Sequence, residues 1–317
     1  MRKQIAKDDP RYPHQIALEY AVAHFHALNF EKAWGYYHSR SHMTWPKGRF
    51  HHIPEWKGED IKGKTILLCY EQALGEQILF SQFVPELVAL GAKVILECEP
   101  RLVPVFQRSF KDTVVVPWQV PWDERVFDAD CWCFLGDLGG VLRPNLHSFH
   151  KTPVGYLKPN KKRVYEIKQQ LKKQFDLKKP LIGLSWFSNA QYYKDAKSIP
   201  FELFKPLMDT QQVVSIQYGR HSESIYSVPG LDLTRDLEGV MALESLCTRV
   251  LSVSNAQAHL AAASGRPTYV LVPMAYGQHY YWYPRLKNSL FYPTASAGSQ
   301  HKEGEWDKLV DIVINKC

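Results

Sequence analysis

The sequence has no apolar run that approaches the ~20 residues a membrane-spanning helix needs, so we expect no membrane span. The segment Met1–Asp9 also lacks the apolar core of a signal peptide. We therefore expect a cytoplasmic protein. Its 317 residues are 45% hydrophobic and 22% charged, which is ordinary for a globular protein and enough for about two domains.

Neither sign of charge is in large excess, because 39 basic residues stand against 32 acidic ones and the net charge is +7. Part of the basic excess lies in the run 158–179. No recognisable DNA-binding or RNA-binding motif accompanies this run. We therefore favour a solvated helix face over a nucleic-acid patch and expect no nucleic-acid partner.

Metal-binding motifs are scarce. Cys131 and Cys133 form a C-x-C pair without a second pair elsewhere, so zinc is not expected. Seven of the 13 histidines fall between His14 and His52, without carboxylates one helical turn away, and we interpret them as helix surface. We expect no metal site and no cofactor. The six cysteines are Cys69, Cys98, Cys131, Cys133, Cys247 and Cys317.

What the sequence does contain is a strand, turn, helix and second strand between Val250 and Pro273. The apolar run 250–253 suits a buried parallel strand. Ser254 and Asn255 are residue types that cap helices, and the helix expected over 256–263 is followed by Gly265. The run 269–272 then predicts a second strand.

This layout aims the start of a helix at the carboxyl edge of a sheet, a place that suits a phosphate group. His259 lies about one turn into the helix and could reach the same anion. The alternative stays open, because an α/β protein has several such helix starts and most of them bind nothing.

Residues 14–42 predict a short helical hairpin. Its pattern is similar to one tetratricopeptide-type unit, with Ala-x-x-x-Phe before the turn and Phe30-Glu-Lys-Ala-Trp34 after it. One such unit cannot bury its own faces. We expect a first segment, 1–62, that holds this hairpin and an irregular connector over 43–62.

From Gly63 the pattern alternates between strands and helices. Strands are expected over 64–70, 93–98, 113–117, 129–134, 180–186, 212–217, 250–253 and 269–272. Helices are expected over 77–90, 102–108, 160–175, 201–208, 239–246 and 308–315. This predicts an α/β fold with two doubly wound, Rossmann-like lobes, 63–157 and 158–317. One continuous sheet is the alternative, but Pro144, Pro153 and Pro159 favour a break.

Several motifs together resemble the tetratricopeptide-repeat-associated glycosyltransferases, relatives of the ADP-heptose heptosyltransferases with the two-lobed GT-B fold. The first is the strand, loop and helix of 63–85, which contains Gln72-Ala-Leu-Gly-Glu76. The second is Ile182-Gly-Leu-Ser-Trp-Phe-Ser188 with Lys197-Ser-Ile-Pro200. The others are Ser254-Asn-Ala-Gln-Ala-His-Leu260, Ser289-Leu-Phe-Tyr-Pro293 and Gly304-Glu-Trp306.

The resemblance implies a role for each matching residue. Glu76 takes the place of the family's Asp, which acts as the catalytic base, with a helix-start glutamate as the alternative. Lys197 and His259 match the Lys and His of the donor-phosphate site, with a solvated lysine and a core histidine as alternatives. The remaining donor-binding candidates are Ser185, Ser188, Gln217, Ser254, Asn255 and Ala256.

The chain departs from the family pattern at four positions. Ala73 replaces a Gly, and Glu76 lengthens an Asp by one methylene. Ser254 and Asn255 replace the Asp and the Thr of the donor turn. A misplacement on the order of 1 Å can cost about 100-fold in rate. These changes could alter the donor or abolish activity.

The leading hypothesis is a metal-independent glycosyltransferase, of hexosyl or heptosyl type, that moves a sugar from a nucleotide-sugar to a protein or glycan acceptor. The nucleotide-sugar would be a co-substrate, and no residue selects among UDP, GDP, ADP and CMP. A catalytically degenerate glycosyltransferase that serves as a binding scaffold is the alternative. A different two-lobed α/β enzyme, such as a sugar-phosphate epimerase, is the third hypothesis.

Overall fold

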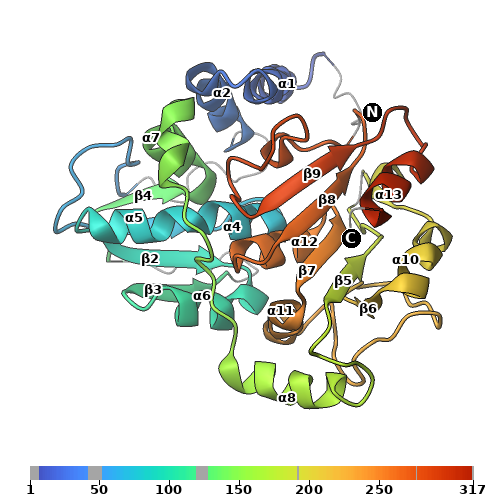
Figure 1. Cartoon of the computed structure of the whole chain (residues 1–317). Coiled ribbons are helices and arrows are strands. Elements are labelled where there is room, and N and C mark those ends of the chain that lie inside the picture. Colours follow the sequence, from blue (N-terminus) through green and yellow to red (C-terminus); the bar gives the residue numbers. More distant parts are fainter. Residues whose placement is uncertain (1–6, 42–51, 119–127, 191–192, 276, 316–317) are drawn as a thin grey trace. The chain divides into compact units, whose positions relative to one another are not determined.

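The computed structural model describes residues 7–41, 52–118, 128–190, 193–275 and 277–315. The chain divides into two compact units, Met1–Thr152 and Pro153–Cys317, each with its own parallel sheet (Figure 1). Among the helices of the described ranges, none combines the length and the apolar character needed to cross a membrane. Cys317, His42 and His51, which the sequence analysis considered, lie outside the described residues, as does part of the expected connector.

Two consecutive helices, called the hairpin below, lie at the start of the first unit. The hairpin consists of α1 (Tyr12–His26) and α2 (Phe30–Tyr37), followed by the short 3-10 helix η1 (His38–Arg40). The turn between the helices is tight because Leu28 adopts a positive φ of 58°. Asn29 caps α2 by accepting a hydrogen bond from the Lys32 amide at 3.4 Å.

The hairpin packs on the rest of the first unit through Trp34. Its indole Nε1 donates to the Arg143 carbonyl at 2.8 Å, and its ring lies over Gly139 in α7 (Leu138–Leu142). A Cβ atom at Gly139 would lie 2.2 Å from that ring, so a glycine is required for this close approach. Phe30 adds a ring contact with Phe149, at a centroid distance of 4.6 Å.

The sheet of the first unit has the order β3-β2-β1-β4, and every neighbouring pair is parallel. The strands are β1 (Thr65–Cys69), β2 (Lys93–Cys98), β3 (Thr113–Pro117) and β4 (Cys131–Phe134). They confirm the four strands expected from the apolar runs. The chain moves outward from β1 to β3 and then returns to the other side of β1. The strand order therefore reverses between β1 and β4, which is where open α/β sheets bind ligands.

The helices of the first unit differ from the prediction in one respect. The single helix expected over 77–90 is instead α4 (Leu74–Phe80), η2 (Ser81–Phe83) and α5 (Val84–Ala89). Pro85 lacks an amide hydrogen and begins a new helix more readily than it continues one, which explains the break. The other helical segments are η3 (Pro100–Leu102), α6 (Val103–Ser109), η4 (Leu135–Asp137) and η5 (Leu146–Lys151).

The sheet of the second unit is also parallel throughout, with the order β6-β5-β7-β8-β9. The strands are β5 (Leu181–Ser185), β6 (Gln212–Ser215), β7 (Arg249–Val253), β8 (Thr268–Val272) and β9 (Ala295–Ser299). The first four confirm the prediction, and β9 was not predicted. Here the strand order reverses between β5 and β7.

Helices cover both faces of this second sheet (Figure 1). Leu181 and Val250 face one apolar core, with α8 (Lys161–Leu171) and α11 (Leu237–Leu246). Ile182 and Leu251 face the other, with α13 (Asp307–Ile314). Such burial on both faces is expected of parallel strands. The helical segments are α8 (Lys161–Leu171), α9 (Lys194–Lys197), η6 (Phe201–Phe204), α10 (Lys205–Thr210), α11 (Leu237–Leu246), α12 (Ala256–Ala263), η7 (Tyr280–Trp282) and α13 (Asp307–Ile314).

The basic helix α8 has an apolar side and a solvated side. Ile167 and Leu171 are buried, while its lysines are exposed. Asn160 caps the helix and also donates to Glu238 of α11 at 3.0 Å. The interpretation of this run as a solvated helix face agrees with these positions.

Candidate functional site

Glu76 lies just after the turn between β1, the first strand of the first unit, and helix α4. Gln72 turns the chain with a φ of 57°, Ala73 is extended, and α4 begins at Leu74. The helix expected from residue 77 therefore begins three residues earlier, at Leu74. Glu76 is half-buried in the first turn of α4, where the helix dipole favours a negative charge. Its role as a catalytic base stays a prediction.

Beside this turn lies a buried ion pair that the sequence analysis missed. The carboxylate of Glu71, which is 1% exposed, accepts hydrogen bonds from Arg40 Nε and Nη2, both at 2.7 Å. It also accepts one from the amide of Gly136, which follows β4. Glu71 follows β1, so this carboxylate joins the two strand ends at the point where the strand order reverses. Arg40, from η1, therefore ties the hairpin to the turn that leads to Glu76.

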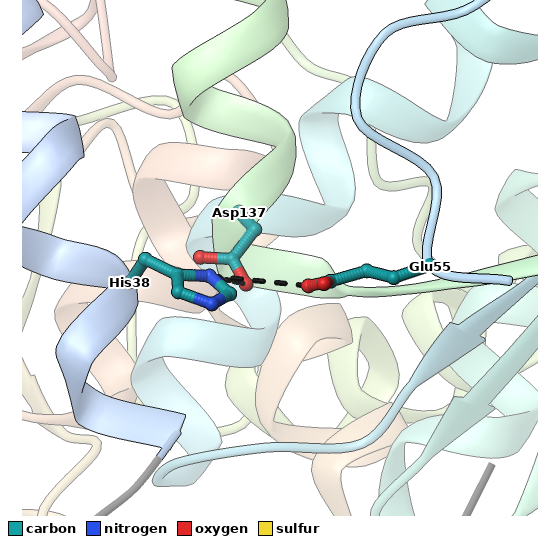
Figure 2. A group of neighbouring side chains, drawn as sticks. All are labelled: His38, Glu55 and Asp137. Carbon is teal, nitrogen blue, oxygen red and sulfur yellow. Dashed lines mark hydrogen bonds and ion pairs between the residues drawn. The ribbon is translucent and has the colours of Figure 1, made fainter. Parts of the chain in front are cut away.

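Arg40 is part of a larger charged cluster. Its Nη1 also donates to Asp137, and Asp137 accepts from His38 Nδ1 at 3.1 Å. The pKa of His38 is raised, first by its hydrogen bond to Asp137. Burial by itself would raise the pKa of Asp137, but the charges of Arg40 and His38 hold it below its ordinary value. Glu55 faces the same ring nitrogen, with its Oε1 3.9 Å from His38 Nδ1 (Figure 2).

In the second unit, three of the predicted donor residues form one hydrogen-bonded network at the ends of neighbouring strands. Gln217 Oε1 accepts from Ser185 Oγ at 2.9 Å and from the amides of Trp186 and Phe187 at 2.8 and 2.7 Å. Asn255 Nδ2 donates to Ser185 Oγ at 2.7 Å and to the Phe187 carbonyl at 3.1 Å. These side chains hold the loop after β5 in shape.

The turn into α12 is built as the Asn255 residue type predicts. Asn255 is the N-cap, and its Oδ1 accepts from the Ala258 amide at 3.2 Å. Ser254 Oγ instead accepts from the indole of Trp282 at 2.8 Å. Ala256, the first residue of the helix, is half-buried, whereas Ser254 and Asn255 are buried.

Ser188 lies further along the loop after β5 and is 2% exposed. Its hydroxyl accepts from the Ala190 amide at 3.4 Å. Its own amide donates to Ser198 Oγ at 3.3 Å, which joins this loop to the residue after Lys197. Ser188 is thus close in space to the α9 segment, as the resemblance requires of the two motifs.

His259 and Lys197 belong to one buried basic group. His259 is 2% exposed, and its Nδ1 lies 2.7 Å from the hydroxyl of Tyr292. Burial, and then the charge of Lys197, lower the pKa of His259 to about 3, so its ring is neutral at neutral pH. Lys197 is 4% exposed, and its Nζ lies 2.6 Å from Nε2 of His279. His259 is therefore not the source of positive charge in this group.

Aromatic rings enclose this basic group. The ring of His259 contacts Trp282 and Tyr281, at centroid distances of 4.7 and 5.1 Å. His279 stacks on Tyr281, with an interplanar angle of 4°. Because Trp282 also donates to Ser254, the structure brings Ser254, His259 and Lys197 together. Their role as a donor site stays a prediction.

A cavity lies beside the loop after β6, and of its lining residues the sequence analysis predicted only Gln217 as a site residue. It has a volume of about 520 Å³ and is lined by residues 217–221 and 227–234. Arg220 lies 4.2 Å over the ring of Phe187, and Lys194 lies 5.4 Å from the same ring. The sequence feature that indicates this cavity is Gln217-Tyr-Gly-Arg220, a polar segment that follows a strand. In the structure Gly219 turns the chain there with a φ of 68°.

Comparison with known proteins gives one relative by sequence and several by fold. The chain is 32% identical over 291 residues to a Caulobacter vibrioides protein named FlbA, in an alignment that covers 81% of this chain. That alignment covers 48% of FlbA, so the chain spans about half the length of this curated relative. No protein-family model matches the chain.

Two solved glycosyltransferases share the fold at low sequence identity. The glycosyl transferase family 9 protein from Veillonella parvula aligns with a TM-score of 0.53 and 11% identity, over 77% of this chain and 88% of that protein. The ADP-heptose LPS heptosyltransferase II from E. coli aligns with a TM-score of 0.50 and 13% identity, over 80% of this chain and 97% of that protein. The chain has an α/β fold with parallel sheets, similar to the fold of these glycosyltransferases.

Proposed function

We propose that this protein is a glycosyltransferase that moves a sugar from a nucleotide-sugar donor to a protein or glycan acceptor. Its two parallel-sheet units would be the lobes of a GT-B fold, with the first on the acceptor side and the second on the donor side. The observation that carries the proposal is the buried Lys197, whose charge acts on His259 in α12. The fold similarity to two glycosyltransferases supports it.

The donor site follows from the charge that a nucleotide-sugar carries. Its diphosphate is the leaving group, and negative charge builds up on it as the glycosidic bond breaks. Lys197 would neutralise this charge together with the first amides of α12, which have no partners within the helix. The cavity after β6 would receive the nucleoside. The E. coli neighbour is named for ADP-heptose, and a nucleoside diphosphate sugar is the class proposed here.

The acceptor side rests on Glu76 and the hairpin. A carboxylate that accepts the proton of the acceptor hydroxyl contributes about 100- to 10,000-fold in rate, and Glu76 is the residue we assign to this role. The transfer needs no metal in this scheme, because Lys197 and the helix amides carry the leaving-group charge. The tetratricopeptide-like pair α1 and α2 would help to present the acceptor.

Lys197→Met tests the donor site. The loss of a charge-assisted hydrogen bond should weaken nucleotide-sugar binding by about 10- to 150-fold, measured by calorimetry against a panel of nucleotide-sugars. Lys302→Met is the matched control, because Lys302 is exposed and pairs with Glu305 at the surface. This control should bind as the wild type does.

Two outcomes would count against the proposal. Equal donor affinity in Lys197→Met and in the wild type, with the fold intact, would refute the donor site. Donor binding by the wild type without hydrolysis or transfer, across a broad acceptor panel, would favour a catalytically degenerate binding scaffold instead.

A further inference from the structure

We propose that His38, Glu55 and Asp137 bind a divalent first-row transition-metal ion, of which Zn²⁺ is the best fit. The side chains come from three separate segments of the first unit: η1, the extended residues before Trp56, and η4. Figure 2 shows their ligand atoms turned toward one another. These atoms, one from each residue, all lie within 4.8 Å of one another.

The distances suit ions that bind at short range. His38 Nδ1 lies 3.1 Å from Asp137 Oδ2 and 3.9 Å from Glu55 Oε1. Two atoms that each bind Zn²⁺ at ~2.1 Å in tetrahedral geometry lie about 3.4 Å apart. These two separations fall on either side of that value. The third pair, the oxygens of Glu55 and Asp137, lies within 4.8 Å, so the Glu55 side chain would move toward the other two ligands as the ion binds.

The ligand types narrow the choice of ion. One imidazole nitrogen and two carboxylate oxygens suit zinc and its neighbours in the first transition row, whereas Mg²⁺ and Ca²⁺ prefer oxygen alone. The side chain of His38 is 46% exposed, so water can reach the group and fill a fourth position. Three protein ligands and one open position form a common Zn²⁺ arrangement.

Neighbouring charges orient the ligands. Arg40 donates to the second carboxylate oxygen of Asp137, which fixes the direction of the oxygen that faces His38. Hydrogen bonds of this kind, from outside the set of ligands, commonly fix carboxylates at metal sites. Lys57 Nζ lies 3.9 Å from Glu55 Oε2, but its side chain is 72% exposed and can turn into solvent. A bound ion would hold the hairpin end, the segment before Trp56 and the end of β4 together.

This ion stands apart from the proposed transfer chemistry, and no step of that chemistry passes through it. The sequence pattern predicts no metal here, because it places His38 on a helix surface. Glu55 and Asp137 are distant from His38 in sequence, so no local spacing motif exists. The site arises only when the fold brings the three segments together.

Metal binding by the full-length chain, freed of metal with a chelator and then dialysed, tests the proposal. Calorimetric titration with Zn²⁺ should give one ion per chain, and Co²⁺ should give a visible absorption band that Zn²⁺ removes. His38→Ala and the isosteric Glu55→Gln should each weaken Zn²⁺ binding by at least about tenfold. Glu55→Gln keeps the test valid even if His38→Ala disturbs the η1 segment.

The matched control is the double variant His147→Ala/His150→Ala. These two rings also lie close together, with centroids 4.9 Å apart, and could bind an ion adventitiously. The control should retain the wild-type affinity. Binding that survives His38→Ala and Glu55→Gln but disappears in the control would overturn the proposal. So would the absence of any Zn²⁺ binding by the wild type, which would leave His38 and Asp137 as an ion pair only.

Discussion

Replacing Arg40 by Met should destabilise the first unit strongly. The guanidinium is 6% exposed and donates to Glu71 at 2.7 Å through each of two nitrogens, to Asp137, and to the Tyr37 carbonyl at 3.0 Å. The methionine side chain fills similar space but leaves two carboxylates buried without their principal partner. Breaking a buried ion pair from one side costs about 3–5 kcal/mol.

The pair also offers its own internal control. Arg40→Met combined with Glu71→Gln removes the positive and the negative charge together, while the amide oxygen can still accept from Gly136. This double variant should be more stable than Arg40→Met alone, because no unpaired Glu71 charge remains buried. The hydrogen bond from Gly136 to Glu71 makes a glutamine preferable to an apolar residue at this position.

The assay is urea unfolding followed by fluorescence and circular dichroism, with a chelator present so that metal binding does not contribute. Arg11→Met provides the surface comparison, because Arg11 and Asp9 form an ion pair whose Arg11 side chain is 54% exposed. Surface pairs of this kind contribute little to stability. If Arg40→Met lowers the free energy of unfolding no more than Arg11→Met does, the buried cluster does not stabilise the unit and the reasoning fails.

Two further predictions concern the proposed donor and acceptor residues. Because the pKa of His259 is about 3 in the folded chain and ordinarily 6.5, the unfolded chain binds a proton that the native chain does not between these values. The free energy of unfolding should therefore fall as the pH falls below 6.5, by about 2 kcal/mol at pH 5, and His259→Gln should flatten this slope. An NMR titration in which the His259 ring protonates near pH 6.5 would contradict this. Glu76→Gln should keep donor binding but lower sugar transfer by at least about 100-fold, with Glu76→Asp retaining more activity. Transfer by Glu76→Gln at the wild-type rate would place the base elsewhere.

Much of the fold could be predicted because most strands are marked by short apolar runs in the local sequence. The strands β2 and β3 have the predicted bounds, since each contains a run of apolar, mostly β-branched residues that follows a polar residue. Helix α12 also has its predicted bounds, because Asn255 caps its start and Gly265, at a φ of 79°, follows its end. The boundaries expected after residues 62 and 157 stay predictions.

Strand β9 could not be predicted, because its sequence Ala-Ser-Ala-Gly-Ser contains no β-branched or aromatic residue. Its small side chains are required by its neighbours. A Cβ atom at Gly298 would lie 2.4 Å from the Tyr269 hydroxyl and 2.8 Å from Leu309. The identity of this strand therefore depends on contacts with β8 and α13, which no local pattern reveals.

The candidate site divides in the same way. The turn at Ser254 and Asn255 could be predicted from the sequence, because helix capping depends on only a few neighbouring residues. The partnership of Asn255 with Ser185 could not, since it joins residues 70 positions apart in the chain. The neutrality of His259 was equally hidden, because it follows from burial among Tyr281, Trp282 and Tyr292.

The hydrogen bonds divide the proposed donor residues into two groups, whose replacement should have different effects. Ser185, Gln217 and Asn255 bond mainly to one another and to the loop after β5, so their replacement should disturb the loop before it disturbs any single ligand contact. Lys197 differs, because its buried Nζ lies beside His279 Nε2 rather than within this network. The diphosphate of a nucleotide-sugar would accept a charge-assisted hydrogen bond from this side chain. For that reason Lys197 is the residue whose replacement most directly tests the proposed function.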